Sequence, residues 1–152
     1  MTLRHIYEFK TTLPATIDAV WDFHAQPDVL KKLMPFPIIV HIHRDARTSL
    51  MAGEIEFTLW LLFIPSRWRV EHDAGPHEFS FVDRLLEGPV ASWQHEHLLR
   101  EVEGGVELTD RVTLQHYAQG FWALFTRLFF SGLPMQILFF YRHWRTRREI
   151  LR

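Results

Sequence analysis

The sequence predicts an α+β domain in which a curved antiparallel sheet of about seven strands wraps around a long C-terminal helix, with two short helices after the first strand. Two observations carry this prediction: seven stretches alternate between polar and apolar residues, and the last part of the chain returns to helical spacing. The chain has 152 residues, of which 47% are hydrophobic. That is enough for one hydrophobic core and too little for two, so we expect a single domain over residues 1–152.

The first strand and the two short helices come from the N-terminal part. Residues 3–13 alternate as a half-buried strand does. Residues 17–24 place apolar side chains at helical spacing behind a possible cap at Thr16. A second short helix begins at Pro27 and ends before Pro35.

Six more strands are predicted in the middle of the chain. They cover residues 38–44, 54–63, 67–73, 78–86, 92–102 and 106–117. The breaks between them are Gly53, Pro65, Gly75-Pro76, Gly88-Pro89 and Gly104-Gly105. Such short connections favour antiparallel neighbours over crossovers.

The segment 121–152 has helical spacing, with a break expected near Gly132 and Pro134. Its apolar part, residues 121–141, raises the alternative of a membrane span. Arg127 lies inside that stretch, and a central arginine costs about 2.5–3.5 kcal/mol on insertion scales. An open sheet with one apolar face needs a cover, so we expect this helix to lie on the sheet.

Charge and cysteine content exclude several classes of protein. The chain has no cysteine, which rules out disulfides, thiolate metal ligands and a cysteine nucleophile. We expect a cytoplasmic protein without a signal peptide. The net charge is −1, and the basic residues gather only in the tail, residues 142–152, so nucleic acid is not an expected partner. The tail arginines fit a solvated helix end, and weak contact with an anionic membrane surface is the alternative.

The strand period sorts the two faces of the sheet, and the face toward the long helix is not purely apolar. The residues that we expect to line a ligand cavity on this face are Trp68, Phe79, Phe81, Asp83, Trp93, Val112, Leu114 and His116. The residues that we assign as candidate catalytic groups on the same face are His72, His95, His97 and Asp110. Buried polar groups without partners cost about 1–3 kcal/mol each, so these side chains must pair or line a wet cavity.

The Gly104-Gly105 turn should bring His95 and His97 onto the strand that carries Asp110. Three uses of the cluster stay open: a structural hydrogen-bond network, an acid–base site, or a metal site. Two histidines two residues apart are weak evidence for a metal, so we assign no metal and no cofactor. We assign no role to His24.

The sequence resembles the START-like, or SRPBCC, superfamily, in its polyketide cyclase/dehydrase-like ligand-binding branch. The N-terminal residues that carry the resemblance are Leu13-Pro14-Ala15 before Val20-Trp21, Pro35-Phe36-Pro37, Gly53, Arg67-Trp68-Arg69-Val70-Glu71-His72 and Phe81-Val82-Asp83. Those that follow are Gly88-Pro89, Trp93-Gln94-His95-Glu96-His97, Gly104-Gly105, Leu108-Thr109-Asp110-Arg111-Val112 and Phe140-Tyr141-Arg142.

The resemblance implies the helix-grip fold and a cavity between the sheet and the long helix for an apolar or aromatic small molecule. It leaves the function open, because this fold serves both binding proteins and enzymes. We expect a carrier or sensor of a hydrophobic ligand first. A cyclase- or dehydratase-type acid–base enzyme that uses the cavity His and Asp residues is the second possibility. Association with a membrane or a protein partner through the aromatic helix and basic tail is the third.

Overall fold

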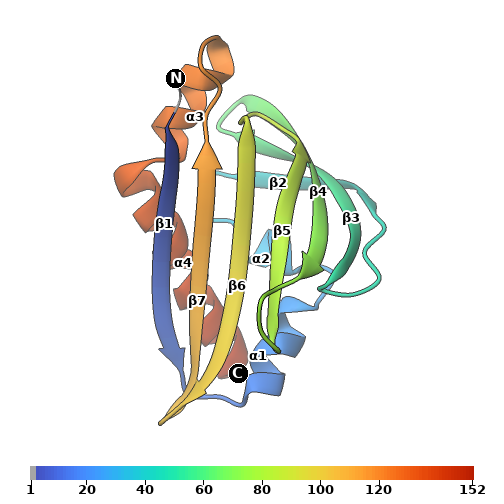
Figure 1. Cartoon of the computed structure of the whole chain (residues 1–152), viewed down its shortest axis with the longest axis vertical. Helices are drawn as coiled ribbons and strands as arrows, with labels where there is room; N and C mark the ends of the chain where they lie inside the picture. The colour runs from blue at the N-terminus through green and yellow to red at the C-terminus, as the bar shows by residue number, and fades with distance from the viewer. Residues whose placement is uncertain (1–2) are drawn as a thin grey trace.

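The computed structural model describes residues 3–152, so the first two residues of the predicted domain lie outside the described part. One seven-stranded sheet has the order β1-β7-β6-β5-β4-β3-β2, with antiparallel neighbours throughout (Figure 1). Its strands are β1 (Arg4–Leu13), β2 (Ile39–Asp45), β3 (Ala52–Leu61), β4 (Ile64–Ala74), β5 (Ser80–Glu87), β6 (Ser92–Val102) and β7 (Gly105–Gln115). The helices are α1 (Ile17–His24), α2 (Val29–Lys32), α3 (Phe121–Phe129) and α4 (Gly132–Ile150). The predicted helix-grip architecture is confirmed.

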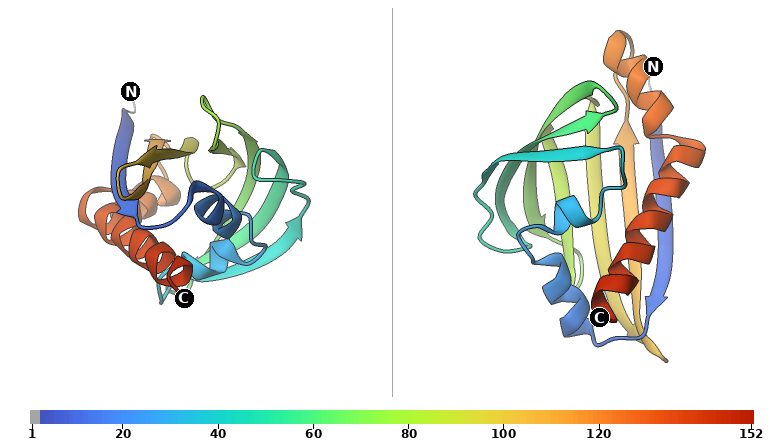
Figure 2. Two further views of the ribbon diagram at one scale, coloured as in Figure 1. Left: turned by 90° about the horizontal axis from the view of Figure 1, so that it is seen from below. Right: turned by 180° about the vertical axis from the view of Figure 1, so that it is seen from behind.

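The sheet curls around an interior that α4 closes along the β1 and β7 side, while α1 and α2 lie at one end of the opening (Figure 2). The ring of Phe9 on β1 stacks on Phe139 of α4 with centroids 4.6 Å apart. Thr16 caps α1, because its hydroxyl accepts a hydrogen bond from the Ala19 amide at 3.2 Å. The predicted cover of the sheet is therefore present.

The turn between β6 and β7 fixes the register of these two strands, which decides which of their side chains face one another in the interior. Gly105 has φ 145°, and a Cβ built there would lie 1.9 Å from the carbonyl oxygen of Leu13. Only glycine tolerates both conditions. With this turn in place, His97 lies directly opposite Asp110 on the neighbouring strand.

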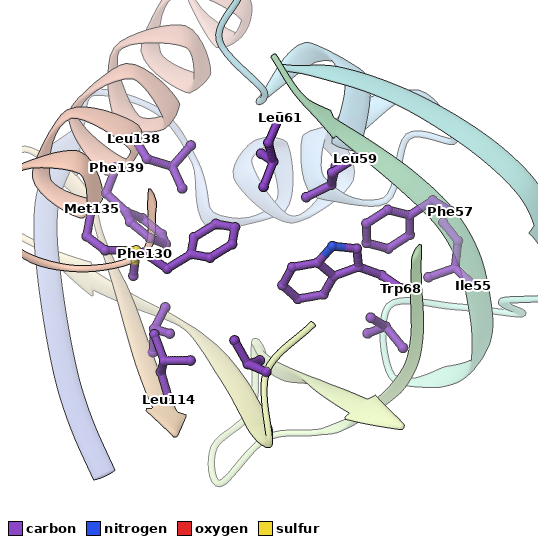
Figure 3. Close-up of a cluster of buried hydrophobic side chains, with 13 residues drawn as sticks. Ile55, Phe57, Leu59, Leu61, Trp68, Leu114, Phe130, Met135, Leu138 and Phe139 are labelled. Atoms are coloured by element: carbon purple, nitrogen blue, oxygen red, sulfur yellow. The ribbon is translucent and has the colours of Figure 1, made fainter. Parts of the chain in front are cut away.

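The largest apolar cluster lies between the concave face and α4. Figure 3 shows Phe130, Leu138 and Phe139 facing Phe57, Leu59 and Trp68 across the interior. Strand alternation explains this placement, since every second residue of β3 and β4 points inward.

The C-terminal segment is helical as predicted, and the break expected near Gly132 divides it into two helices. The helices meet at an angle of 55° around the break, and Gly132 takes φ 46°. Among residues 3–152, no single helix is long and apolar enough to cross a membrane. On length and composition alone, α3 and α4 would qualify only as a bent pair.

Three predicted breaks or strand ends were wrong. Gly53 does not separate two strands; it lies inside β3, opposite His72. Pro65 does not break the chain; it lies inside β4 opposite Trp60, because the hairpin turns at Leu62, whose φ is 60°. Strand β5 begins at Ser80 rather than residue 78, because Phe79 has φ 48° and cannot continue a strand.

Candidate functional site

An internal cavity of about 110 Å³ lies between the concave face of the sheet and α4. Aromatic side chains form much of one end. There the rings of Trp68, Trp93 and Phe130 contact one another edge to face, with ring centroids 5.5 to 5.8 Å apart. The polar groups of the wall include His24, His97 and Arg142, which lie among apolar side chains such as Phe81 and Phe139. The cavity therefore has an aromatic end and a polar end.

Half of the predicted ligand-lining residues line this cavity. Trp68, Phe81, Asp83 and Trp93 do so. Phe79, Val112, Leu114 and His116 do not, and for them the expected placement was wrong.

The side chains of these four residues make contacts outside the cavity. The positive φ of Phe79 turns its ring against Trp21 of α1, 5.6 Å away. Val112 and Leu114 are fully buried in the hydrophobic core cluster. The His116 Nδ1 lies 2.9 Å from the Thr126 hydroxyl and ties β7 to α3.

The candidate catalytic residues His72, His95, His97 and Asp110 do come together inside the sheet, and they meet Asp83 there. His72 lies opposite Asp83 in the β4–β5 pair, and its Nε2 is 2.9 Å from Asp83 Oδ1. The other ring nitrogen, Nδ1, lies 2.9 Å from the carbonyl oxygen of Leu50 and must donate to it. From β6, His97 Nε2 hydrogen-bonds Asp83 Oδ2 at 2.9 Å.

Asp110 is the second centre of the cluster. It accepts hydrogen bonds from His95 Nε2 at 2.7 Å and from His143 Nε2 of α4 at 2.6 Å. His97 Nδ1 lies 3.2 Å from the same carboxylate, at an angle that makes no aligned hydrogen bond. Asp83 Oδ1 likewise has no aligned partner in residues 3–152 despite the nearby His72. His97 is thus placed between two carboxylates.

The surroundings separate the pKa values of the two neighbouring imidazoles, whose centroids are 3.8 Å apart. Burial opposes the charge on His97, but the carboxylates of Asp83 and Asp110 outweigh it and raise the pKa of His97 to about 9. Burial and the nearby His97 lower the pKa of His95 to about 4. At neutral pH His97 is a cation, whereas His95 is neutral, with its proton on Nε2 and a lone pair on Nδ1.

Burial also raises the pKa of a carboxyl group, yet His72 and His97 hold the pKa of Asp83 well below its usual value. His143 and His95 do the same for Asp110. Both carboxylates are therefore ionised at neutral pH.

Three residues of this site were not among the predicted ones. His24 is buried and lines the cavity, its Nδ1 donates to the Val20 carbonyl oxygen at 2.8 Å, and burial lowers its pKa to about 4. His143 contacts Asp110, and Arg142 is buried rather than part of a solvated helix end. The helical spacing of Phe139, Arg142, His143 and Thr146 could have marked this inward face of α4.

Asp83, His95 and His97 could also hold a divalent metal, because one ligand atom from each lies within 4.8 Å of the others. The Nε2 of His95 is bonded to Asp110, as the second nitrogen of a metal-bound histidine usually is. Without a metal, His97 Nε2 and Asp83 Oδ2 share a hydrogen bond. The geometry is compatible with all three uses of the cluster.

Neither a protein-family model nor a curated protein sequence matches this chain. Solved structures do match its fold. The Zhui aromatase/cyclase from Streptomyces sp. R1128 is 16% identical with a TM-score of 0.69, over 98% of this chain and 92% of the other. A START superfamily protein from Mycobacterium smegmatis is 7% identical with a TM-score of 0.69, over 97% of both chains.

A nucleoside-diphosphate sugar epimerase from Corynebacterium glutamicum is 22% identical with a TM-score of 0.69 over 95% of this chain. The match spans only 29% of the epimerase. At such identities the comparisons establish the fold alone. The chain has the START-like helix-grip fold, as its resemblance to that superfamily predicted.

Proposed function

We propose that this protein binds a hydrophobic, ring-containing small molecule in the cavity between the sheet and α4, as a carrier or sensor in the cytoplasm. The observation that carries the proposal is the cavity itself, whose aromatic end around Trp68 and Trp93 is matched by a polar end around His24 and His97. Apolar walls with a few polar groups are typical of small-molecule sites. An engineered cavity of about 150 Å³ binds benzene, so a cavity of about 110 Å³ suits a single ring with limited adjustment.

Native mass spectrometry of freshly purified protein tests the proposal, together with displacement of a fluorescent hydrophobic probe. Leu30 of α2 lines the cavity and is only partly buried, so Leu30→Trp should fill the space without unfolding the chain. Leu124→Trp, on the exposed side of α3, is the matched control. The probe should bind wild type and the control but not Leu30→Trp. Equal binding by all three proteins would contradict the proposal.

An acid–base enzyme is the second candidate, and the differing states of His95 and His97 favour it. A neutral imidazole with a free Nδ1 lone pair can accept a proton, and Asp110 would orient it and stabilise the cation that forms. Both ring nitrogens of His97 face carboxylates, so this residue is better suited to remain a cation than to transfer a proton. The aromatase/cyclase with the same fold supports this candidate by analogy only.

Exchange of deuterium from D₂O into a bound ligand distinguishes the two functions. Wild type should catalyse exchange at an acidic carbon of the co-purifying ligand, and His95→Gln should abolish exchange while still binding the ligand. A carrier would bind without exchange in both proteins.

A further surface contact is proposed for the exposed side of α3 and α4. Six large apolar side chains there are more than half exposed: Phe121, Leu124, Leu128, Leu133, Ile137 and Phe140. Exposed apolar stripes of this kind mark interaction surfaces, and the nearby Arg148, which lies over the Trp144 ring, suits an anionic membrane surface. Co-sedimentation with anionic but not neutral vesicles, weakened by Phe140→Ser, is the expected result. Concentration-dependent self-association without vesicle binding would instead assign the stripe to a second copy of the chain.

A further inference from the structure

Arg142 of α4 lies in an unusual environment for an arginine. Its side chain lines the cavity, and the residue is only 9% exposed. The guanidinium carbon lies 5.4 Å from the centroid of the Phe139 ring. Within residues 3–152, no protein group makes a hydrogen bond or ion pair with this guanidinium. Buried charges in proteins are normally paired, because an unpaired one carries a large desolvation cost.

The carboxylates of Asp110 and Asp83 lie near enough to favour the charge of Arg142, but neither makes a hydrogen bond or ion pair with it. Asp110 accepts from His95 and His143, and Asp83 accepts from His97. By contrast, Arg145 on the next turn pairs with Glu149 at 2.9 Å. The five N–H donors of Arg142 are therefore left for a group that enters the cavity.

We propose that the ligand of this cavity is an anion, an apolar ring-sized molecule whose carboxylate or similar planar oxyanion is bound by Arg142. This inference rests on the proposed binding function and specifies the ligand class. A guanidinium presents parallel donors that match the two oxygens of a carboxylate, and partial removal from solvent strengthens such a pair.

The rest of the cavity fits such a ligand. The carboxylate would lie at the polar end and the ring toward Trp68, Trp93 and Phe130. The negative charges that an anion would meet are Asp83 and Asp110, and the His97 cation between them screens both. Burial lowers the pKa of Arg142 in the ligand-free protein, and a bound anion would relieve this destabilisation of its charge.

The test compares acids with amides of the same shape by isothermal titration calorimetry. Benzoate is paired with benzamide, and phenylacetate with phenylacetamide. Wild type should bind each acid at least about tenfold more tightly than its amide. Arg142→Met, which keeps the length of the side chain, should reduce that preference to less than about threefold, and Arg142→Lys should retain part of it. Arg148→Met, an exposed arginine on the same helix, should keep the full preference.

Each result of these titrations either supports the proposal or overturns it. If the amides bind wild type as tightly as the acids, the ligand class is wrong while the binding function stands. If the preference for acids persists in folded Arg142→Met, another group recognises the anion and the assignment to Arg142 fails. If Arg142→Met does not fold, a reduced preference in Arg142→Lys supports the inference, and an unchanged preference there overturns it. If neither acid nor amide binds wild type, the proposed function fails and takes the inference with it.

Discussion

His143 of α4 and Asp110 of β7 join the long helix to the centre of the sheet through a hydrogen bond of 2.6 Å. The contact connects residues 33 positions apart and brings α4 to the same carboxylate that His95 and His97 contact. The helix that covers the cavity is thereby tied to the polar cluster in its wall.

His97→Ala should destabilise the protein strongly. The change removes the cation between two buried carboxylates, and losing one partner of a buried charged group costs about 3–5 kcal/mol. Urea denaturation measures this free energy of unfolding. His41→Ala, at an exposed position on β2, should change it by less than about 0.5 kcal/mol. A stable His97→Ala protein that loses only ligand binding or turnover would show that the residue is functional rather than structural, and loss of a bound metal would identify a metal site.

Stability should pass through a maximum near pH 6.5, the ordinary pKa of histidine in an unfolded chain. Between about pH 6.5 and 9, folded His97 keeps a proton that the unfolded chain loses, so the free energy of unfolding falls as pH rises. Between about pH 6.5 and 4, His24 and His95 stay neutral in the fold while the unfolded chain takes up protons, so stability falls as pH drops.

Substitutions distinguish the loss of stability above pH 6.5 from the loss below it. His97→Gln should remove the alkaline decline, and His24→Gln should weaken only the acidic one. Thermal unfolding across the pH range measures both. A flat profile between pH 6.5 and 9 in wild type would mean that His97 is not held as a cation.

Arg142→Met should stabilise the ligand-free protein. Removing an unpaired buried charge relieves its desolvation cost, by about 1 kcal/mol or a rise in Tm of roughly 2–4 °C. Differential scanning calorimetry compares it with Arg148→Met, which should leave Tm nearly unchanged. A clear fall in Tm for Arg142→Met would assign a structural role to this arginine.

A chain that ends after Tyr117 should not fold cooperatively. Without α3 and α4, the inward faces of β3, β4 and β7 lose the side chains of Phe130, Leu138 and Phe139 that cover them. Circular dichroism during heating would show no sharp transition. A soluble remainder with a cooperative transition would mean that the helices are dispensable to the core.

The alternation of apolar and polar residues was enough to predict the strands and the inward face that carries His72, His95, His97 and Asp110. The positions of Phe79 and Leu62 could not be read from alternation, because a positive φ takes a residue out of the extended backbone on which alternation rests. His24, Arg142 and His143 escaped for another reason. Helical spacing marks the inward face of α4, but the depth to which its polar side chains are buried depends on how the helices dock against the sheet.

The six tryptophans offer the most direct test of the central claim that the interior cavity binds a ring-containing molecule. In ¹⁵N NMR spectra each indole N–H gives a separate signal, and Trp68 and Trp93 line the cavity while Trp144 lies exposed on α4. On titration with benzoate, the signals of Trp68 and Trp93 should shift and saturate, and that of Trp144 should stay in place. If Trp68 and Trp93 do not respond at any concentration, or if only Trp144 shifts, the cavity is not the binding site and the account is contradicted.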